Sequence, residues 1–198
     1  MNGFYEAMEK RRSIYGISNE KIVSEDRIIE VVSKAVKHTP SSFNSQSGRV
    51  VILFDDNHKK LWDITTETLR KITPEDKFAA TLSKMEMFSS GYGTILIFEE
   101  METVENLKAN FPLYADKFEE WSNHSSGMLQ YVIWTSLENE GLGATLQHYN
   151  PLIDEEVKAT YDLPKTWKLI AQMPFGKPTA PAGNKAFMEL EKRIKVFK

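Results

Sequence analysis

Apolar residues recur at helical spacing along much of the chain. The clearest run is 125–140, where apolar side chains return at three- and four-residue steps, and Gly141 follows where a helix commonly ends. A second run starts after Ser24, a typical helix-capping residue, and stops at Pro40. The same patterns predict four more helices: from Phe4 to near Ser13, around Leu61–Leu69, onward from Thr73-Pro74-Glu75, and over Glu155–Tyr161.

Short apolar runs between the helical segments predict buried strands. These runs are 50–54, 94–99, 144–147 and 167–173. Helices outnumber strands, so the expected fold class is α+β or a three-layer α/β sandwich. A chain of 198 residues is long enough for one sizeable core, and we expect a single domain over 1–198. The tail over 186–197 alternates poorly, and we expect it to extend over another surface.

Composition narrows the function classes. The formal net charge is −3 with Lys and Arg spread along the chain, which favours neither a nucleic-acid groove nor an anionic membrane surface. Cys is absent, which excludes disulfides, thiol catalysis and thiolate metal sites together. The four His residues lack metal-site spacing, and no Gly-x-Ser-x-Gly elbow is present. Without a signal-peptide core or a bilayer-length apolar run, the protein is expected to be cytoplasmic.

Two polar segments allow both a structural and a functional interpretation. The loop 39–49, TPSSFNSQSGR, crowds neutral hydrogen-bonding side chains before a predicted strand. It could be an ordinary turn, or it could bind a polar ligand with many oxygens and nitrogens. Arg11-Arg12-Ser13 ends the first predicted helix, where the helix macrodipole favours arginine, but the same residues could bind phosphate. Neither motif decides between these interpretations by itself.

The order of the motifs is more specific than any one of them. Arg-Arg-Ser ends the first helix, Pro-Ser-Ser-Phe-Asn-Ser-Gln follows the second, and the long buried helix leads into EGLGATLQHYNP and then PFGKP. In this order, essentially the whole chain resembles the FMN-dependent nitroreductase family. RRSIYG, FPLYADKFEEWSNHSSGM and GLGATLQHYNP are similar to the short branch found in fungi and Gram-positive bacteria. The resemblance implies a central, mostly antiparallel sheet flanked by helices.

The resemblance also implies which residues bind FMN. The polar loop lies against the flavin, the Arg-Arg-Ser motif contacts the phosphate and the pyrimidine side, and the segment after Gly-Leu-Gly-Ala passes its backbone N–H groups near flavin N5. A basic residue of the tail completes the phosphate site, and Lys185 is chosen over Lys177. These expectations carry over to Arg11, Arg12, Ser13, Pro40, Ser41, Ser42, Asn44, Gln46, Gln147, His148, Tyr149 and Lys185.

Two segments depart from the family pattern. Many relatives have Glu-Gly where this chain has His148-Tyr149, and relatives often continue Asn-Ser-Gln with Pro and an aromatic residue, where this chain has Ser47-Gly48-Arg49. The family also has a mobile segment over the flavin face. Aromatic residues in that segment could stack on an acceptor or simply pack a surface helix; here they are Phe111, Tyr114, Phe118 and Trp121.

The resemblance implies an oxidoreductase in which NAD(P)H reduces bound FMN and a nitroaromatic or quinone-like acceptor then reoxidises it by a ping-pong route. A catalytic acid or base is not required for this chemistry. A homodimer with FMN at the subunit interface is implied as well, and the broad apolar face of 125–140 agrees with a partner surface. Two alternatives stay open: a flavin-binding regulatory or storage protein of the same fold, and a non-catalytic α/β interaction protein.

Overall fold

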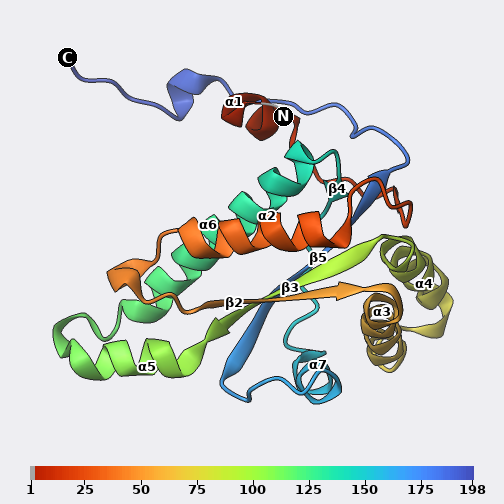
Figure 1. Ribbon diagram of the computed structural model, residues 1–198, viewed down its shortest axis with the longest axis horizontal. Coiled ribbons are helices and arrows are strands. Elements are labelled where there is room, and N and C mark those ends of the chain that lie inside the picture. Colours follow the sequence, from red (N-terminus) through yellow and green to blue (C-terminus); the bar gives the residue numbers. More distant parts are fainter. Residues whose placement is uncertain (1–2) are drawn as a thin grey trace.

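The computed structural model describes residues 3–198 (Figure 1). The helices are α1 (Phe4–Lys10), α2 (Glu25–His38), α3 (Asp55–Arg70), α4 (Glu75–Ser89), α5 (Met101–Asn110), α6 (Phe118–Asn139) and α7 (Asp154–Thr160). The strands are β1 (Ile17–Ser18), β2 (Gly48–Phe54), β3 (Gly93–Glu100), β4 (Gly143–Ala144) and β5 (Trp167–Pro178). No helix of the described residues is long and apolar enough to span a membrane.

The strands form one sheet in the order β1-β5-β3-β2, with β4 also paired to β5. Every strand pairing in this sheet is antiparallel. Strand β3 lies inside the sheet and is buried almost throughout, because it has β5 on one side and β2 on the other. Its side chains alternate between the two faces of the sheet, as the pleat of a strand requires. The sheet therefore has two apolar faces that need cover.

Helices cover both faces, and the prediction of a three-layer α+β fold is confirmed. Helices α2 and α6 pack on one face, where Ile28, Leu129 and Ile133 join Ile95 and Ile97 of β3 in one apolar cluster. Helices α3, α4 and α7 pack on the other face, as Figure 1 shows. The second cluster contains Leu61, Trp62, Met85, Phe88, Leu96, Phe98 and Val157.

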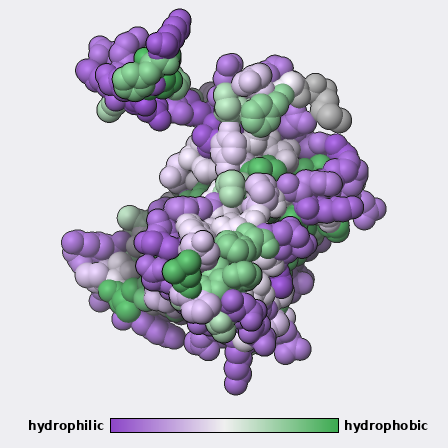
Figure 2. Space-filling view, turned by 90° about the vertical axis from the view of Figure 1, so that its left-hand side faces the viewer, coloured by the Kyte–Doolittle hydropathy of each residue, from purple (hydrophilic) through white to green (hydrophobic). Residues whose placement is uncertain are grey.

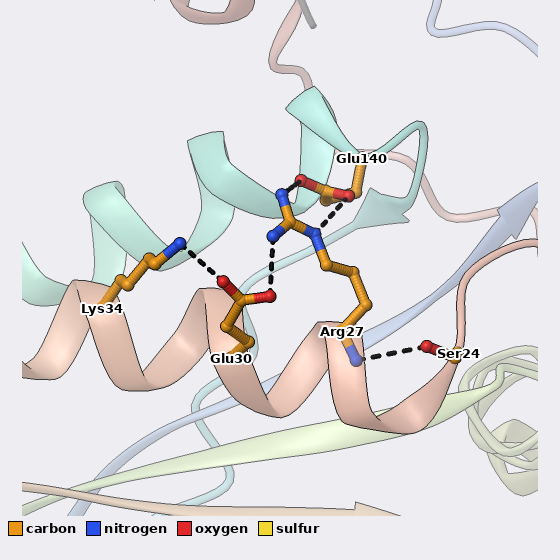
Figure 3. A network of polar contacts seen from close by, with 5 residues as sticks. All are labelled: Ser24, Arg27, Glu30, Lys34 and Glu140. Carbon is orange, nitrogen blue, oxygen red and sulfur yellow. Dashed lines mark hydrogen bonds and ion pairs between the residues drawn. The ribbon is translucent and has the colours of Figure 1, made fainter.

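Helix α2 is fixed against the end of α6 by a charged network (Figure 3). Arg27 donates two hydrogen bonds to the carboxylate of Glu140, with N–O distances of 2.7 and 3.1 Å. Arg27 also bonds to Glu30, which accepts a further bond from Lys34. The two-pronged geometry of the Arg27–Glu140 pair sets how α2 lies along α6.

Several element boundaries differ from the sequence prediction, and α5 and β1 were not predicted. Helix α6 begins at Phe118 instead of residue 125, and Ser125 lies inside it, where its hydroxyl donates to Trp121 O at 3.0 Å. Helix α1 ends at Lys10, so the arginine motif follows the helix instead of ending it. The third strand is reduced to β4, followed by a single bridge at Gln147, and β5 continues to Pro178.

The C-terminal tail leaves the body of the molecule after β5. Its only helical turn among the described residues is Leu190–Lys192. The tail ends as a lobe that stands apart from the rest in Figure 2, and its apolar side chains face solvent. Val196 is 70% exposed and Phe197 is 94% exposed. The tail was expected to extend over another surface, but within residues 3–198 no apolar surface lies beneath these two side chains.

Candidate functional site

The segment 143–149 runs along the outer edge of β5. Gly143 and Ala144 pair with Gly176 and Phe175, and the bridge between Gln147 and Gln172 continues this contact. The backbone groups that do not pair with β5 face away from the sheet. This predicted flavin segment therefore presents an open edge of peptide groups.

The arginine motif lies beside that edge. Ser13 forms a parallel bridge with Ala144, and the Ile14 N–H donates to Ala144 O at 3.0 Å. The Arg11 guanidinium carbon lies 4.3 Å from the centre of the Trp134 ring, and its buried Nε has no hydrogen-bond partner within residues 3–198. The structure thus brings the predicted Arg11–Ser13 and Gln147–Tyr149 segments to one place.

The tail reaches the arginine motif as well. Arg12 Nη2 donates to Gly183 O at 2.8 Å, which places the start of the tail against the motif. Lys185 follows two residues later, exposed, with its Nζ 5.1 Å from the centre of the Phe187 ring. Lys177 is paired with Glu20 at 2.6 Å. Of the two lysines considered for the phosphate, Lys185 is therefore the one that forms no ion pair within the described residues.

One carboxyl group near Arg11 is that of Glu138. Arg11 and Arg12 form no ion pair within residues 3–198. The pKa of Glu138 is raised by burial, and the charges of Lys10 and Arg11 only partly oppose that effect. Tyr149 is half-buried with its ring edge-on to Trp62, and burial raises the pKa of its phenol to about 12. Tyr149 is therefore neutral at physiological pH and cannot act as a base.

The polar loop lies between α2 and β2 and has an unusual backbone. Phe43, Asn44 and Gln46 have φ angles of 55°, 50° and 49°, in the left-handed region. The loop is held by Ser41, whose hydroxyl accepts from Gln46 N at 2.9 Å, and by Arg49, which donates to Gln46 O at 2.6 Å. Strain of this kind collects at functional sites. The backbone of the loop favours the interpretation as a binding loop, which stays a prediction.

Within one chain, the loop is remote from the arginine motif. The loop follows the C-terminal end of α2, and the arginine motif lies near Ala144, toward the other end of that helix (Figure 1). Helix α2 has 14 residues, which corresponds to about 21 Å at 1.5 Å per residue. The structure thus divides the predicted site residues into two groups: one with Arg11–Ser13, Gln147–Tyr149 and Lys185, the other with Pro40–Gln46.

A cluster of aromatic side chains surrounds Phe43. Its ring centre lies 4.8 Å from Phe111, 5.3 Å from Phe118 and 6.2 Å from both Tyr114 and Trp121. The rings of Phe43 and Trp121 are nearly parallel, at 17°. The four predicted aromatic residues therefore collect at the polar loop. Phe118 is buried, whereas Phe43 and Tyr114 are 51% and 42% exposed and available to a ligand.

A cavity of about 520 Å³ lies on the other side of the loop. Its walls include Ser41, Gln46, Arg49 and Trp167, and Glu99 lies in its lining. Glu99 is 1% exposed, and its carboxylate oxygens have no hydrogen-bond partner within the described residues. Burial raises the pKa of this carboxyl, and the neighbouring Ser47 and Ser122 hydroxyls, followed by the charge of Arg49, oppose that effect. The loop thus borders a largely apolar cavity with a buried carboxyl group, in addition to the aromatic cluster.

The sequence prediction missed two residues of the candidate site, one at the polar loop and one beside the segment 147–149. Phe43 occupies the variable position of the Pro-Ser-Ser-x-Asn motif, and such positions are easily passed over. Gln172 is fully buried and contacts the Gln147–Tyr149 segment. Its signal was present in the sequence, because a lone amide inside the apolar run LIAQMPF needs a partner when it is buried.

Comparisons with known proteins identify the family. The sequence profile of the nitroreductase family matches residues 8–177, and the chain belongs to that family. The Saccharomyces cerevisiae nitroreductase FRM2 is 34% identical over 187 residues, which are 93% of each chain. The nitroreductase CinD of Lactococcus lactis, solved with chloramphenicol, is 43% identical, with a TM-score of 0.91 over 99% of this chain and 100% of that one.

CinD has also been solved with 4-nitrophenol, with a TM-score of 0.90 at 43% identity and the same coverage. A structure from Desulfovibrio desulfuricans in complex with FMN shares the fold at 18% identity, with a TM-score of 0.71 over 100% of this chain and 99% of that one. The predicted family, with its fungal and Gram-positive branch, is confirmed, and the chain is an oxidoreductase of the nitroreductase type.

Proposed function

We propose that residues 1–198 form one FMN-binding domain that uses NAD(P)H to reduce nitroaromatic or quinone-like acceptors by a ping-pong route. The observation that carries this proposal is the peptide edge of 145–148, beside an arginine motif that forms no ion pair within residues 3–198. Cations and backbone donors arranged along one line suit a ligand that has a phosphate at one end and a polar ring at the other.

The residues present fit FMN. Arg11, Arg12 and Lys185 supply positive charge without carboxylate partners within residues 3–198, which suits a dianionic phosphate. The buried Arg11 Nε lacks an acceptor in the protein, and a phosphate oxygen would supply one. The open edge and the polar loop offer neutral groups that would orient the ring without adding charge. Electron transfer between NAD(P)H and an acceptor is chemistry that bound FMN supplies.

The second half of the site would come from another copy of the chain, in a homodimer. Pro40–Gln46 follows the far end of α2, a helix about 21 Å long, so a second chain would place its own loop against the flavin held by the first. Apolar side chains on α2 and α6 support a partner surface. Exposed fractions are 45% at Ile29, 40% at Val36, 42% at Met128 and 37% at Val132.

The acceptor would be a flat aromatic compound. Phe43 and its neighbours present ring faces beside the loop that would cover the flavin. The relative CinD, at 43% identity, has been solved with 4-nitrophenol, a nitroaromatic compound. Ring stacking against the Phe43 cluster would orient such an acceptor without needing a charged group.

A spectrum of the purified protein and steady-state kinetics test the proposal together. The protein should bind FMN with the absorption of a flavoprotein, and initial NAD(P)H rates at several fixed acceptor concentrations should give parallel double-reciprocal lines. Bound flavin without turnover would favour the regulatory or storage alternative. A preparation that cannot be loaded with FMN would overturn the proposal, and intersecting lines would replace the ping-pong route by a ternary complex.

A further inference from the structure

Gln172 is a polar residue in the middle of an apolar strand. It belongs to β5, and its side chain is fully buried. Its backbone N–H donates to Gln147 O at 2.9 Å, and its backbone carbonyl accepts from Gln147 N at 2.7 Å. Its side-chain Oε1 accepts from Tyr149 N at 2.8 Å, and its Nε2 lies 3.5 Å from Asn150 Oδ1. All four polar groups of this residue thus contact the segment 147–150.

These contacts determine which backbone donor of the segment remains available. The N–H groups of Gln147 and Tyr149 are both used by Gln172. The N–H of His148, between them, takes part in no hydrogen bond of residues 3–198. Backbone groups alternate in direction along an extended segment, so this N–H faces away from β5, on the open edge. The His148 side chain is exposed and does not fill that edge.

We propose that Gln172 is a positioning residue: it holds the segment on both sides of His148 so that the His148 N–H is aimed at N5 of the flavin. This inference rests on the proposed FMN site and deepens it. The amide suits the role because its oxygen is an acceptor for the Tyr149 N–H. An apolar side chain of the same shape would leave that N–H without its partner, and the segment would shift to satisfy it.

The consequence concerns the flavin itself. N5 offers a lone pair as a hydrogen-bond acceptor in oxidised FMN and carries hydrogen after reduction. A donor held at N5 therefore favours the oxidised form. Releasing the segment should favour the reduced form by about tenfold, the usual effect of one hydrogen bond. For a two-electron couple this is a rise in midpoint potential of about 30 mV.

The test compares three variants of the FMN-loaded protein. Gln172→Met keeps the side-chain length and removes the amide, so it should raise the midpoint potential by about 30 mV. Gln172→Glu should restore the wild-type potential, because a buried carboxyl stays protonated and offers both an acceptor and a donor. Gln130→Met is the matched control: Gln130 is also a buried glutamine, but its amide donates to Ser126 within α6. This control should leave the potential unchanged.

Amide hydrogen exchange gives a second readout that does not depend on turnover. In the wild-type protein without FMN, the Tyr149 amide should exchange slowly and the His148 amide rapidly, and FMN should slow the latter. In Gln172→Met without FMN, the Tyr149 amide should exchange faster. If Gln172→Met does not fold, Gln172→Asn replaces it in both measurements, because its shorter amide cannot reach the Tyr149 N–H.

The outcomes separate this inference from the proposed function. If the wild-type protein binds no FMN, both are overturned. If it binds FMN but the His148 amide gains no protection, or if Gln172→Met and Gln130→Met shift the potential equally, only the role of Gln172 is overturned. A rise confined to Gln172→Met, together with rescue by Gln172→Glu, supports the inference.

Discussion

At the scale of single residues, Arg11 is the clearest candidate for binding a phosphate. Its guanidinium lies over Trp134, one of its nitrogens is buried without a partner, and it forms no ion pair within residues 3–198. A buried donor without an acceptor costs free energy, so the side chain is suited to an acceptor supplied by a ligand. The position of this charge beside the 145–148 edge follows from the Ser13–Ala144 bridge.

Arg11→Ala should weaken FMN binding about tenfold to a hundredfold and leave riboflavin binding nearly unchanged, because riboflavin lacks the phosphate. Titrating the apoprotein with both ligands measures the difference. Arg70→Ala is a suitable control, since Arg70 is an exposed residue on α3 paired with Glu67. An equal loss for both ligands would remove Arg11 from the phosphate site.

At the scale of elements, His58 joins α3 to β3 and to the end of α4. Trp62 Nε1 donates to Thr94 Oγ1 at 3.0 Å, and Thr94 Oγ1 lies 2.8 Å from His58 Nδ1. His58 Nε2 lies 3.1 Å from the carbonyl oxygen of Ser89. A neutral imidazole protonated on Nε2 satisfies every member of this chain. Burial is the main cause that lowers the pKa of His58 to about 4.

The lowered pKa of the buried His58 predicts that the stability of the protein depends on pH. In the unfolded chain, His58 has a pKa near 6.5 and binds a proton below that pH. In the folded protein it remains neutral down to about pH 4. The free energy of unfolding should therefore be largest above pH 6.5 and fall by about 1.4 kcal/mol per pH unit below it, or about 3 kcal/mol in all by pH 4. Denaturant unfolding at several pH values measures the slope.

Two variants isolate the contribution of His58 from that of carboxyl groups, which titrate in the lower part of the same range. His58→Gln should lose the His-dependent slope between about pH 6.5 and 5. His124→Gln, at an exposed position on α6, should keep it. If His58→Gln and the wild-type protein lose stability in parallel, the imidazole is not the group responsible.

At the scale of the whole molecule, the predicted site is divided between the two ends of α2. If two chains share each site, Arg11 serves one flavin and Asn44 of the same chain serves the other. Mixing an Arg11→Ala chain with an Asn44→Gly chain then leaves one intact site in each mixed dimer. Glycine is the substitution of choice at residue 44, because φ there is 50° and alanine would add strain.

Co-refolding the two variants should restore tightly bound FMN at about a quarter of all sites, because half of the randomly paired dimers are mixed and each has one intact site. Each variant refolded by itself provides the baseline. Recovery would show that the site is shared. The absence of recovery, with mixed dimers confirmed by mass, would mean that each site is built within one chain.

The pattern of residues determined the layers of the fold, because burial follows the periodicity of apolar side chains. The runs around α2, α6, β2, β3 and β5 were predicted from that pattern, and the motif order identified the family. Boundaries were less certain: the apolar run of α6 was predicted from residue 125 although the helix begins at Phe118, and the short β4 depends on contact with β5. Local sequence does not record such contacts.

The tertiary structure alone decided which predicted site residues lie together. Arg11 and Gln147 are far apart in sequence but meet because Ser13 pairs beside Ala144, whereas Pro40–Gln46 is separated from them by the length of α2. The left-handed backbone of the loop and the contacts of Gln172 were equally beyond the sequence. The physical reason is that these features depend on strand register and on hydrogen bonds between distant segments, which no local pattern of apolar and polar residues specifies.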